Sequence, residues 1–194
     1  MAATPSTMLE LGTPVSDFAL ADVVSGKTVS PASFKDRKAL LVIFLSQHCP
    51  YVKHVKAELA RVGADYIPQG LGIVAICSND VANYPDDSPE HLKAMALELK
   101  LNYPVCHDES QSVAKAYRAA CTPEFYLYDG ARKLVYRGQL DDSRPKNDIP
   151  VTGKDLRAAL DAVLSGKPVS PEQKPGIGCN IKWKPGNEPD YYSR

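Results

Sequence analysis

The pattern of hydrophobic and polar positions along the chain predicts an α/β fold. Two short, continuous apolar runs, Lys38 to Ser46 and Leu71 to Cys77, are rich in strand-forming residues. Runs of this kind are typical of central strands that are buried on both faces. Between them, from Pro50 onward, apolar residues recur at steps of three and four with basic residues interspersed. This spacing predicts an amphipathic helix that ends near Pro68.

The remaining pattern continues the alternation of strands and helices. Ser88 followed by Pro89 is typical of a helix start, and Asp129 and Gly130 predict the turn of a hairpin. The predicted elements are a helix over 88–101, a strand over 103–106, a helix over 112–120, hairpin strands over 124–129 and 133–137, and a helix over 152–164. This order predicts a mixed, largely parallel central sheet with helices on both faces and an antiparallel edge.

The C-terminal segment differs in composition from the rest of the chain. Residues 167–194 are rich in Pro, Gly, Lys and Asn, and they contain Trp183, Tyr191 and Tyr192. A chain of 194 residues suits one domain with a sizeable core. We therefore predict a single domain over residues 1–166 and a C-terminal arm over 167–194 that packs on it.

Composition and charge exclude several kinds of partner. Lysine plus arginine and aspartate plus glutamate number 23 each, so the formal net charge is zero, which gives no electrostatic basis for binding nucleic acid or an anionic membrane. No window approaches the ~18 consecutive apolar residues of a membrane span. The N-terminus lacks the basic and apolar blocks of a secretory signal. We expect a cytoplasmic protein, and a homodimer is compatible with the sequence.

The cysteines predict neither a disulfide scaffold nor a zinc site. There are five of them, an odd number, and they form neither a C-x-x-C motif nor a paired Cys/His spacing. Reduced thiols are expected in a cytoplasmic protein. We therefore predict no cofactor and no metal, and we expect Cys77 and Cys106 to be structural.

Cys49 lies where a thiol is expected to be reactive. It follows a predicted central strand and directly precedes the predicted helix that begins at Pro50. The helix N-terminus favours an anion, which lowers the pKa of a thiol placed there. Pro50 suits the first helical turn, and His48 would add positive charge if protonated. The simpler alternatives are an inert, buried thiol at Cys49 and a loop histidine without a role at His48.

These residues carry a resemblance to a known family. The segments Leu11 to Phe18, Leu41 to Phe44, Cys49 with Pro50, and Cys121 to Asp129 look like the redoxin branch of the thioredoxin-fold superfamily, which includes the peroxiredoxins. The similarity covers Leu11 to Leu164 in order and spacing. It implies a thioredoxin-like fold and is closest to a group of uncharacterised peroxiredoxin-like proteins.

Some positions of these motifs match thioredoxins, and others match peroxiredoxins. Cys49 follows Phe44 at the spacing of the first, nucleophilic cysteine of thioredoxins, but Val52 replaces the second. Ser46 matches the Thr/Ser position of peroxiredoxins, whereas Val42 stands where their proline is expected.

A second part of the resemblance concerns the segment opposite the thiol. Thr122 and Pro123 resemble the cis-proline motif of thioredoxins, which presents backbone to a substrate chain. They occupy the place from which peroxiredoxins bring an arginine. Arg144 is a candidate replacement for that arginine, although a solvated loop charge is the commoner explanation for such a residue.

A single nucleophile requires a second thiol to resolve its adduct. Cys121 is a candidate because it lies two residues before Pro123, and Cys179 is another because neighbouring glycines allow the arm to fold closely over the site. Structural roles remain open for both. Asn79 follows a central strand, so it is expected beside the Cys49 loop and, with His48, Pro50, Thr122, Pro123 and Arg144, completes the predicted substrate site.

The sequence predicts a thiol-dependent oxidoreductase. Cys49 would attack a disulfide or a peroxide as its thiolate, Cys121 or Cys179 would resolve the adduct, and an external thiol would reduce the product. The partners are then a small thiol, disulfide or peroxide and that reductant. Two alternatives stay open. One is copper(I) handling by Cys49, Cys121, Cys179 and His48. The other is a thioredoxin-fold binding module without catalysis.

Overall fold

A mixed central sheet forms the middle layer of the molecule. The computed structural model describes residues 3–192. The five-stranded sheet has the order β6 (Val105–His107), β5 (Leu71–Cys77), β4 (Ala39–Phe44), β8 (Glu124–Tyr128), β9 (Leu134–Gly138). Strands β4, β5 and β6 are parallel to one another, whereas β8 is antiparallel to both β4 and β9. The predicted mixed sheet with an antiparallel edge is therefore confirmed.

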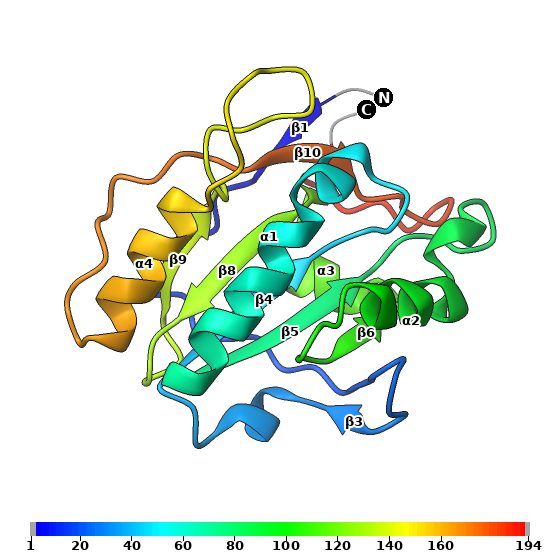
Figure 1. Cartoon of the computed structure of the whole chain (residues 1–194). Helices are drawn as coiled ribbons and strands as arrows, with labels where there is room; N and C mark the ends of the chain where they lie inside the picture. Colours follow the sequence, from blue (N-terminus) through cyan, green and yellow to red (C-terminus); the bar gives the residue numbers. More distant parts are fainter. Residues whose placement is uncertain (1–2, 193–194) are drawn as a thin grey trace.

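Helices cover both faces of this sheet, as the sequence predicts (Figure 1). One face packs against the helices α1 (Pro50–Tyr66), α2 (Pro89–Glu98) and α4 (Lys154–Leu164). The other packs against α3 (Ser112–Ala116) and against Trp183 of the C-terminal segment. Because both faces are covered, every residue of β4 and β5 is buried.

The shorter elements connect these layers. The 3-10 helices are η1 (Pro31–Phe34), η2 (Ile67–Gln69) and η3 (Pro85–Asp87), and a small antiparallel pair is formed by β2 (Leu20–Ala21) and β3 (Thr28–Val29). Helices α2 and α3 end earlier than predicted because Lys100 and Arg118 adopt left-handed backbone, with φ of 51° and 50°. The structure has no helix within residues 3–192 that is long and apolar enough to cross a membrane.

A second sheet, which the sequence pattern does not predict, joins the two ends of the chain to the domain. Strand β10 (Ile177–Asn180) lies between β1 (Ala3–Pro5) and β7 (Cys121–Thr122) and is antiparallel to both. Figure 1 shows β10 and β1 side by side at one end of the central sheet. The predicted ranges 1–166 and 167–194 each include two residues, 1–2 and 193–194, that lie outside the described part of the chain.

Candidate active site

The Cys49 thiol lies at the junction between strand β4 and helix α1. Cys49 is the N-cap of α1, and Pro50 is its first residue, as predicted. The side chain has no exposed surface. In its neutral form the thiol donates a hydrogen bond to the carbonyl oxygen of Thr122, with an Sγ···O distance of 3.2 Å. The peptide bond between Thr122 and Pro123 is cis, which confirms the predicted cis-proline beside Cys49.

Strand β10 brings a second cysteine to the same place. Cys179 pairs with Thr122 in the β10–β7 ladder, and the next residue, Asn180, pairs with Cys121. Both cysteines therefore meet at Thr122, which pairs with Cys179 and accepts a hydrogen bond from the Cys49 thiol. The N-terminus of α1 acts on both thiols, because the backbone N–H of Val52 lowers the pKa of Cys49 and that of Tyr51 lowers the pKa of Cys179.

These donors favour the ionised form of Cys49. A hydrogen bond from the Cys179 thiol lowers the pKa of Cys49 well below its ordinary value, although burial opposes the shift. The hydroxyl of Thr122 and the N–H groups of Val52 and Cys179 lower it further. The same hydrogen bond, together with burial, raises the pKa of Cys179. Of the two thiols, Cys49 is therefore the one whose ionisation the surroundings favour.

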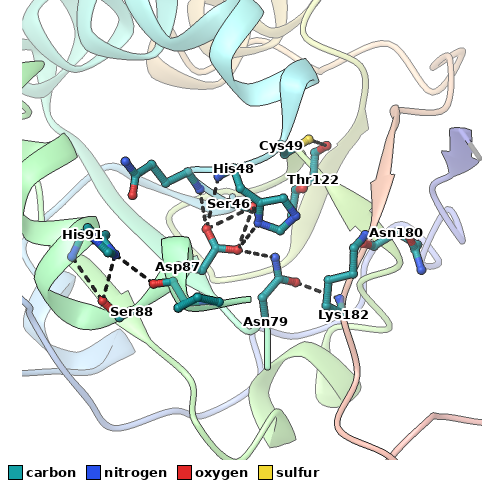
Figure 2. A network of polar contacts seen from close by, with 12 residues as sticks. Ser46, His48, Cys49, Asn79, Asp87, Ser88, His91, Thr122, Asn180 and Lys182 are labelled. Carbon is teal, nitrogen blue, oxygen red and sulfur yellow. Dashed lines mark hydrogen bonds and ion pairs between the residues drawn. The ribbon is translucent and has the colours of Figure 1, made fainter. Parts of the chain in front are cut away.

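A buried carboxylate fixes the loop that leads to Cys49 (Figure 2). Asp87, at the end of η3, has no exposed surface. It accepts hydrogen bonds from Ser46 Oγ (2.9 Å), the N–H of Gln47 (2.7 Å), Nδ1–H of His48 (2.7 Å) and Nδ2–H of Asn79 (2.7 Å). Burial alone would raise the pKa of Asp87, but the bonds from His48 and Asn79 lower it below its usual range. Asp87 is therefore an anion that orients the chain immediately before the thiol.

His48 and Asn79 belong to this network. The His48 ring stacks on Tyr84, with ring centroids 5.4 Å apart, and its Nε2 is buried without a hydrogen-bond partner in the described part of the chain. Asn79 follows β5 and, besides Asp87, contacts the arm, because its Oδ1 accepts from the N–H of Lys182 at 2.8 Å. The structure thus brings Asn79, as expected, beside the Cys49 loop.

Three further candidates from the sequence, Ser46, Arg144 and Cys121, have contacts other than a direct one with the Cys49 thiol. The Ser46 hydroxyl donates to Asp87. Arg144 donates through Nη1 to the carbonyls of Asp141 and Ser143 in its own loop, and it shares a small cavity with Pro123. Cys121 is fully buried, and burial raises the pKa of its thiol. Of the two proposed resolving cysteines, Cys179 is the one that pairs with Thr122, whose carbonyl oxygen accepts from the Cys49 thiol.

The structure does not assemble a metal site from these residues. Within residues 3–192, no group of three or more His, Cys, Asp or Glu side chains is arranged to hold a metal ion. The set considered for copper(I), namely Cys49, Cys121, Cys179 and His48, therefore does not form such a group.

Sequence reasoning missed two charged residues of the site. Asp87 lies in a short polar stretch before a helix cap and resembles any solvated turn residue. Lys182 follows Cys179 by three residues in the arm, and that proximity was its only signal in the sequence. Both are buried in the structure, and both reach the site through loops whose course only the folded chain defines.

The lowered pKa of Cys49 leads to a prediction about pH. Because the pKa of Cys49 is lowered, its thiolate is populated at every pH above that lowered midpoint. Below the midpoint, the thiolate fraction falls about tenfold per pH unit. We expect the midpoint of Cys49 to fall within the range of activated thiols, roughly pH 3.5–7.5, rather than near 8.5. Titrating the ultraviolet absorbance of the thiolate in the wild type and in Cys49→Ser measures it by difference. A difference midpoint above about pH 8 would contradict the prediction.

Comparison with known proteins shows which family the chain matches. The profile of the AhpC/TSA family matches residues 11–137. The search of curated proteins gave no significant match. Among solved structures, an uncharacterised conserved protein from Geobacillus kaustophilus is 54% identical, with a TM-score of 0.94, over 96% of this chain and 98% of that one. A hypothetical protein from Sinorhizobium meliloti 1021 is 51% identical, with a TM-score of 0.92, over 94% of this chain and all (100%) of the other.

A more distant structure identifies the fold. The thioredoxin domain of a thiol-disulfide oxidoreductase from Bacteroides vulgatus has a TM-score of 0.56 at 20% identity, over 66% of this chain and 88% of that one. This likeness confirms the predicted thioredoxin-like fold. The family match extends over more than half of the chain and supports thiol-dependent redox chemistry as the general class of function. The chain belongs to the AhpC/TSA family.

Proposed function

We propose that the protein is a thiol-dependent oxidoreductase in which Cys49 is the nucleophile and Cys179 resolves its adduct. One observation carries the proposal: strand pairing places Cys179 of the arm opposite Thr122, whose carbonyl oxygen accepts a hydrogen bond from the Cys49 thiol at the N-terminus of α1. A thiolate at such a position is activated. A neighbouring thiol can then attack the adduct on Cys49 and form a disulfide within the chain.

In this proposal, Cys49 can react with either a disulfide or a peroxide. With a disulfide, the Cys49 thiolate attacks one sulfur, forms a mixed disulfide and releases the other sulfur as a thiolate. With a peroxide, Cys49 takes one oxygen to become a sulfenic acid, and an alcohol or water leaves. Cys179 then attacks the Cys49 sulfur, which forms the Cys49–Cys179 disulfide and expels either the substrate thiol or water. An external thiol reductant, the second partner in this proposal, restores both thiols.

The substrate site in this proposal lies around the cis-proline. The Thr122 carbonyl contacts Cys49 directly, and His48 presents a buried Nε2 without a partner in residues 3–192. These groups are suited to a small disulfide or peroxide, and peroxide reduction would make the role antioxidant. A cytoplasmic location, expected from the sequence, is part of the same proposal.

Replacing Cys179 by serine tests the resolving step. Because serine cannot displace the adduct, we expect a mixed disulfide or sulfenic acid on Cys49 to persist at least about ten times longer than in the wild type. Reduced protein would receive limiting hydrogen peroxide or, separately, glutathione disulfide, followed by alkylation and peptide mass spectrometry.

The matched control is Cys121→Ser, which removes the other candidate thiol. It should still form the Cys49–Cys179 disulfide. If Cys121→Ser traps the adduct and Cys179→Ser does not, the assignment of the resolving thiol is wrong. If Cys49 of the wild type reacts with neither oxidant faster than Cys77 or Cys106, the enzymatic proposal fails, and the binding module becomes the better description.

A further inference from the structure

The proposed nucleophile is fully enclosed in this conformation of the protein. The Cys49 side chain has no exposed surface, and Cys179 is only 2% exposed. Both side chains belong to the same cluster of buried apolar residues. Reaction of a thiol with a disulfide or with a peroxide requires access to the sulfur. A substrate therefore reaches Cys49 only after part of this cover has moved.

Strand β10 of the arm covers the atom to which the Cys49 thiol is bonded. The carbonyl oxygen of Thr122 accepts a hydrogen bond from this thiol at 3.2 Å, the contact drawn in Figure 2. The backbone of Gly178 passes so close to the same oxygen that no Cβ atom fits between them. Strand β10 also lies beside α1, whose N-cap is Cys49. The arm backbone and the Cys49 thiol are therefore packed against one carbonyl oxygen.

The cavity beside the cis-proline is too small to admit a disulfide. It is lined by Pro123, Gly176 and Ile177, among others, but not by Cys49. Its volume of about 20 Å³ has room for about one water molecule. This cavity therefore does not bring a substrate to the sulfur while β10 stays in place.

A short ladder holds β10 on the cis-proline loop. It pairs with β7 over two residues, whereas β4 pairs with β5 over six and with β8 over five. The N–H of Ile181 adds one bond to the Ala120 carbonyl oxygen, at 3.0 Å. On its other edge β10 pairs with β1, which is fastened to the loop by the Ser6 hydroxyl, a donor to the Glu124 carboxyl. An element held by so few bonds opens at a lower free energy than the central sheet.

Anchors on both sides of β10 keep the rest of the arm in place. Before the strand, the carbonyl oxygen of Lys174 accepts from the N–H of Gln139 at 3.0 Å. After it, the N–H of Lys182 donates to Oδ1 of Asn79 at 2.8 Å. Two glycines lie between these anchors and give the backbone freedom to bend. The segment 175–181 can therefore lift from β7 while the arm stays attached.

We propose that β10 is a gate over Cys49. The strand leaves β7 before a disulfide or a peroxide reacts with the thiol, and it returns before Cys179 attacks the adduct. The return rests on the proposed function, because it concerns the resolving role of Cys179. Docking of the arm therefore slows the first step of the reaction and accelerates the second.

Gly178→Ala, which pushes β10 away from β7, should change the two steps in opposite directions. We expect iodoacetamide to alkylate Cys49 about ten times faster than in the wild type, and the Cys49–Cys179 disulfide to form about ten times more slowly. Peptide mass spectrometry identifies the modified cysteine. The rates are compared about two pH units above the thiolate midpoint of each protein, so that ionisation does not limit them. A merely structural defect in the arm would slow disulfide formation without exposing Cys49.

Ser6→Ala loosens the same strands without altering the arm itself. It removes the hydroxyl that donates to Glu124, so alkylation of Cys49 should again be about tenfold faster. The matched control is Thr7→Ala, whose hydroxyl donates to the Arg118 carbonyl at 2.8 Å. This control should stay within about twofold of the wild type. If folded Gly178→Ala and Ser6→Ala proteins both react at the wild-type rate, the gate is overturned.

A measurement on the wild-type protein does not depend on any variant. If undocking of β10 exposes the thiol, one opening equilibrium protects both Cys49 from alkylation and the Ile181 N–H from hydrogen exchange. Relative to short unfolded peptides, the two protection factors should agree within about threefold. Both should be much smaller than the protection of the β4 amides, which are exposed by global unfolding.

Each other outcome has a definite meaning. Alkylation of Cys49 much faster than exchange of Ile181 would mean that a reagent enters while the arm is docked. Alkylation as slow as exchange of the β4 amides would mean that only global unfolding exposes the thiol. Either result would overturn the inference, while a Cys49–Cys179 disulfide formed by the oxidants would leave the proposed function standing. If the protection factors agree but no disulfide forms, the opening of the gate is supported and the proposed function fails.

Discussion

Replacing Cys49 by serine is expected to lower thiol-dependent turnover at least about a thousandfold. The reason is the ionisation of the sulfur. Cys49 is the thiol whose pKa the surroundings lower, whereas burial raises the pKa of Cys77, Cys106 and Cys121. A serine hydroxyl in the same place stays protonated, because the donors at the start of α1 are too weak to ionise an alcohol near neutral pH.

The measurement is the steady-state reduction of hydrogen peroxide and of glutathione disulfide with a dithiol as the reductant. Cys106→Ala is the matched control, because Cys106 is equally buried but lies in β6 and its thiol pKa is raised to about 12. We expect this control to keep turnover within about threefold of the wild type, apart from a cost in stability. Turnover that survives in Cys49→Ser would remove the central role of this thiol.

The second large effect is expected at Gly178, where the arm backbone passes closest to the cis-proline loop. A Cβ atom built on Gly178 would lie 2.0 Å from the carbonyl oxygen of Thr122, and the obstacle is backbone that cannot rotate away. Gly178→Ala therefore has to push β10 away from β7. We expect a loss of about 1–3 kcal/mol in the free energy of docking the arm. Formation of the Cys49–Cys179 disulfide should slow by about tenfold or more.

Hydrogen exchange and the rate of disulfide formation measure this effect. The N–H of Ile181, which donates to the Ala120 carbonyl at 3.0 Å, should exchange faster once the strand is displaced. Gly176→Ala is the control, because a Cβ there would be 3.3 Å from its nearest neighbour, the Gly138 carbonyl oxygen. If Gly178→Ala forms the disulfide at the wild-type rate and Ile181 stays protected, close docking of the arm is not needed for the reaction.

Local sequence was sufficient for the main elements and for the placement of Cys49. The apolar runs that form β4 and β5 are continuous because both sheet faces are covered, and the period of α1 follows from its single buried face. Proline directly after Cys49 marks the start of the helix, so the local pattern alone is enough to place the thiol at the helix N-terminus. The thioredoxin-like fold and the cis peptide at Pro123 followed from the resemblance of these local motifs.

The sequence by itself therefore determined the layers of the fold and the position of Cys49, because hydrophobic period and helix capping depend on neighbours only a few residues away. The tertiary structure decided the partners of the thiol. Cys179 lies opposite Thr122 only through pairing between strands that are distant in the chain. Asp87 contacts the Cys49 loop, and Lys182 contacts Asn79, only because segments distant in sequence are buried against one another. Contacts of this kind depend on how separate segments pack, and no local pattern encodes them.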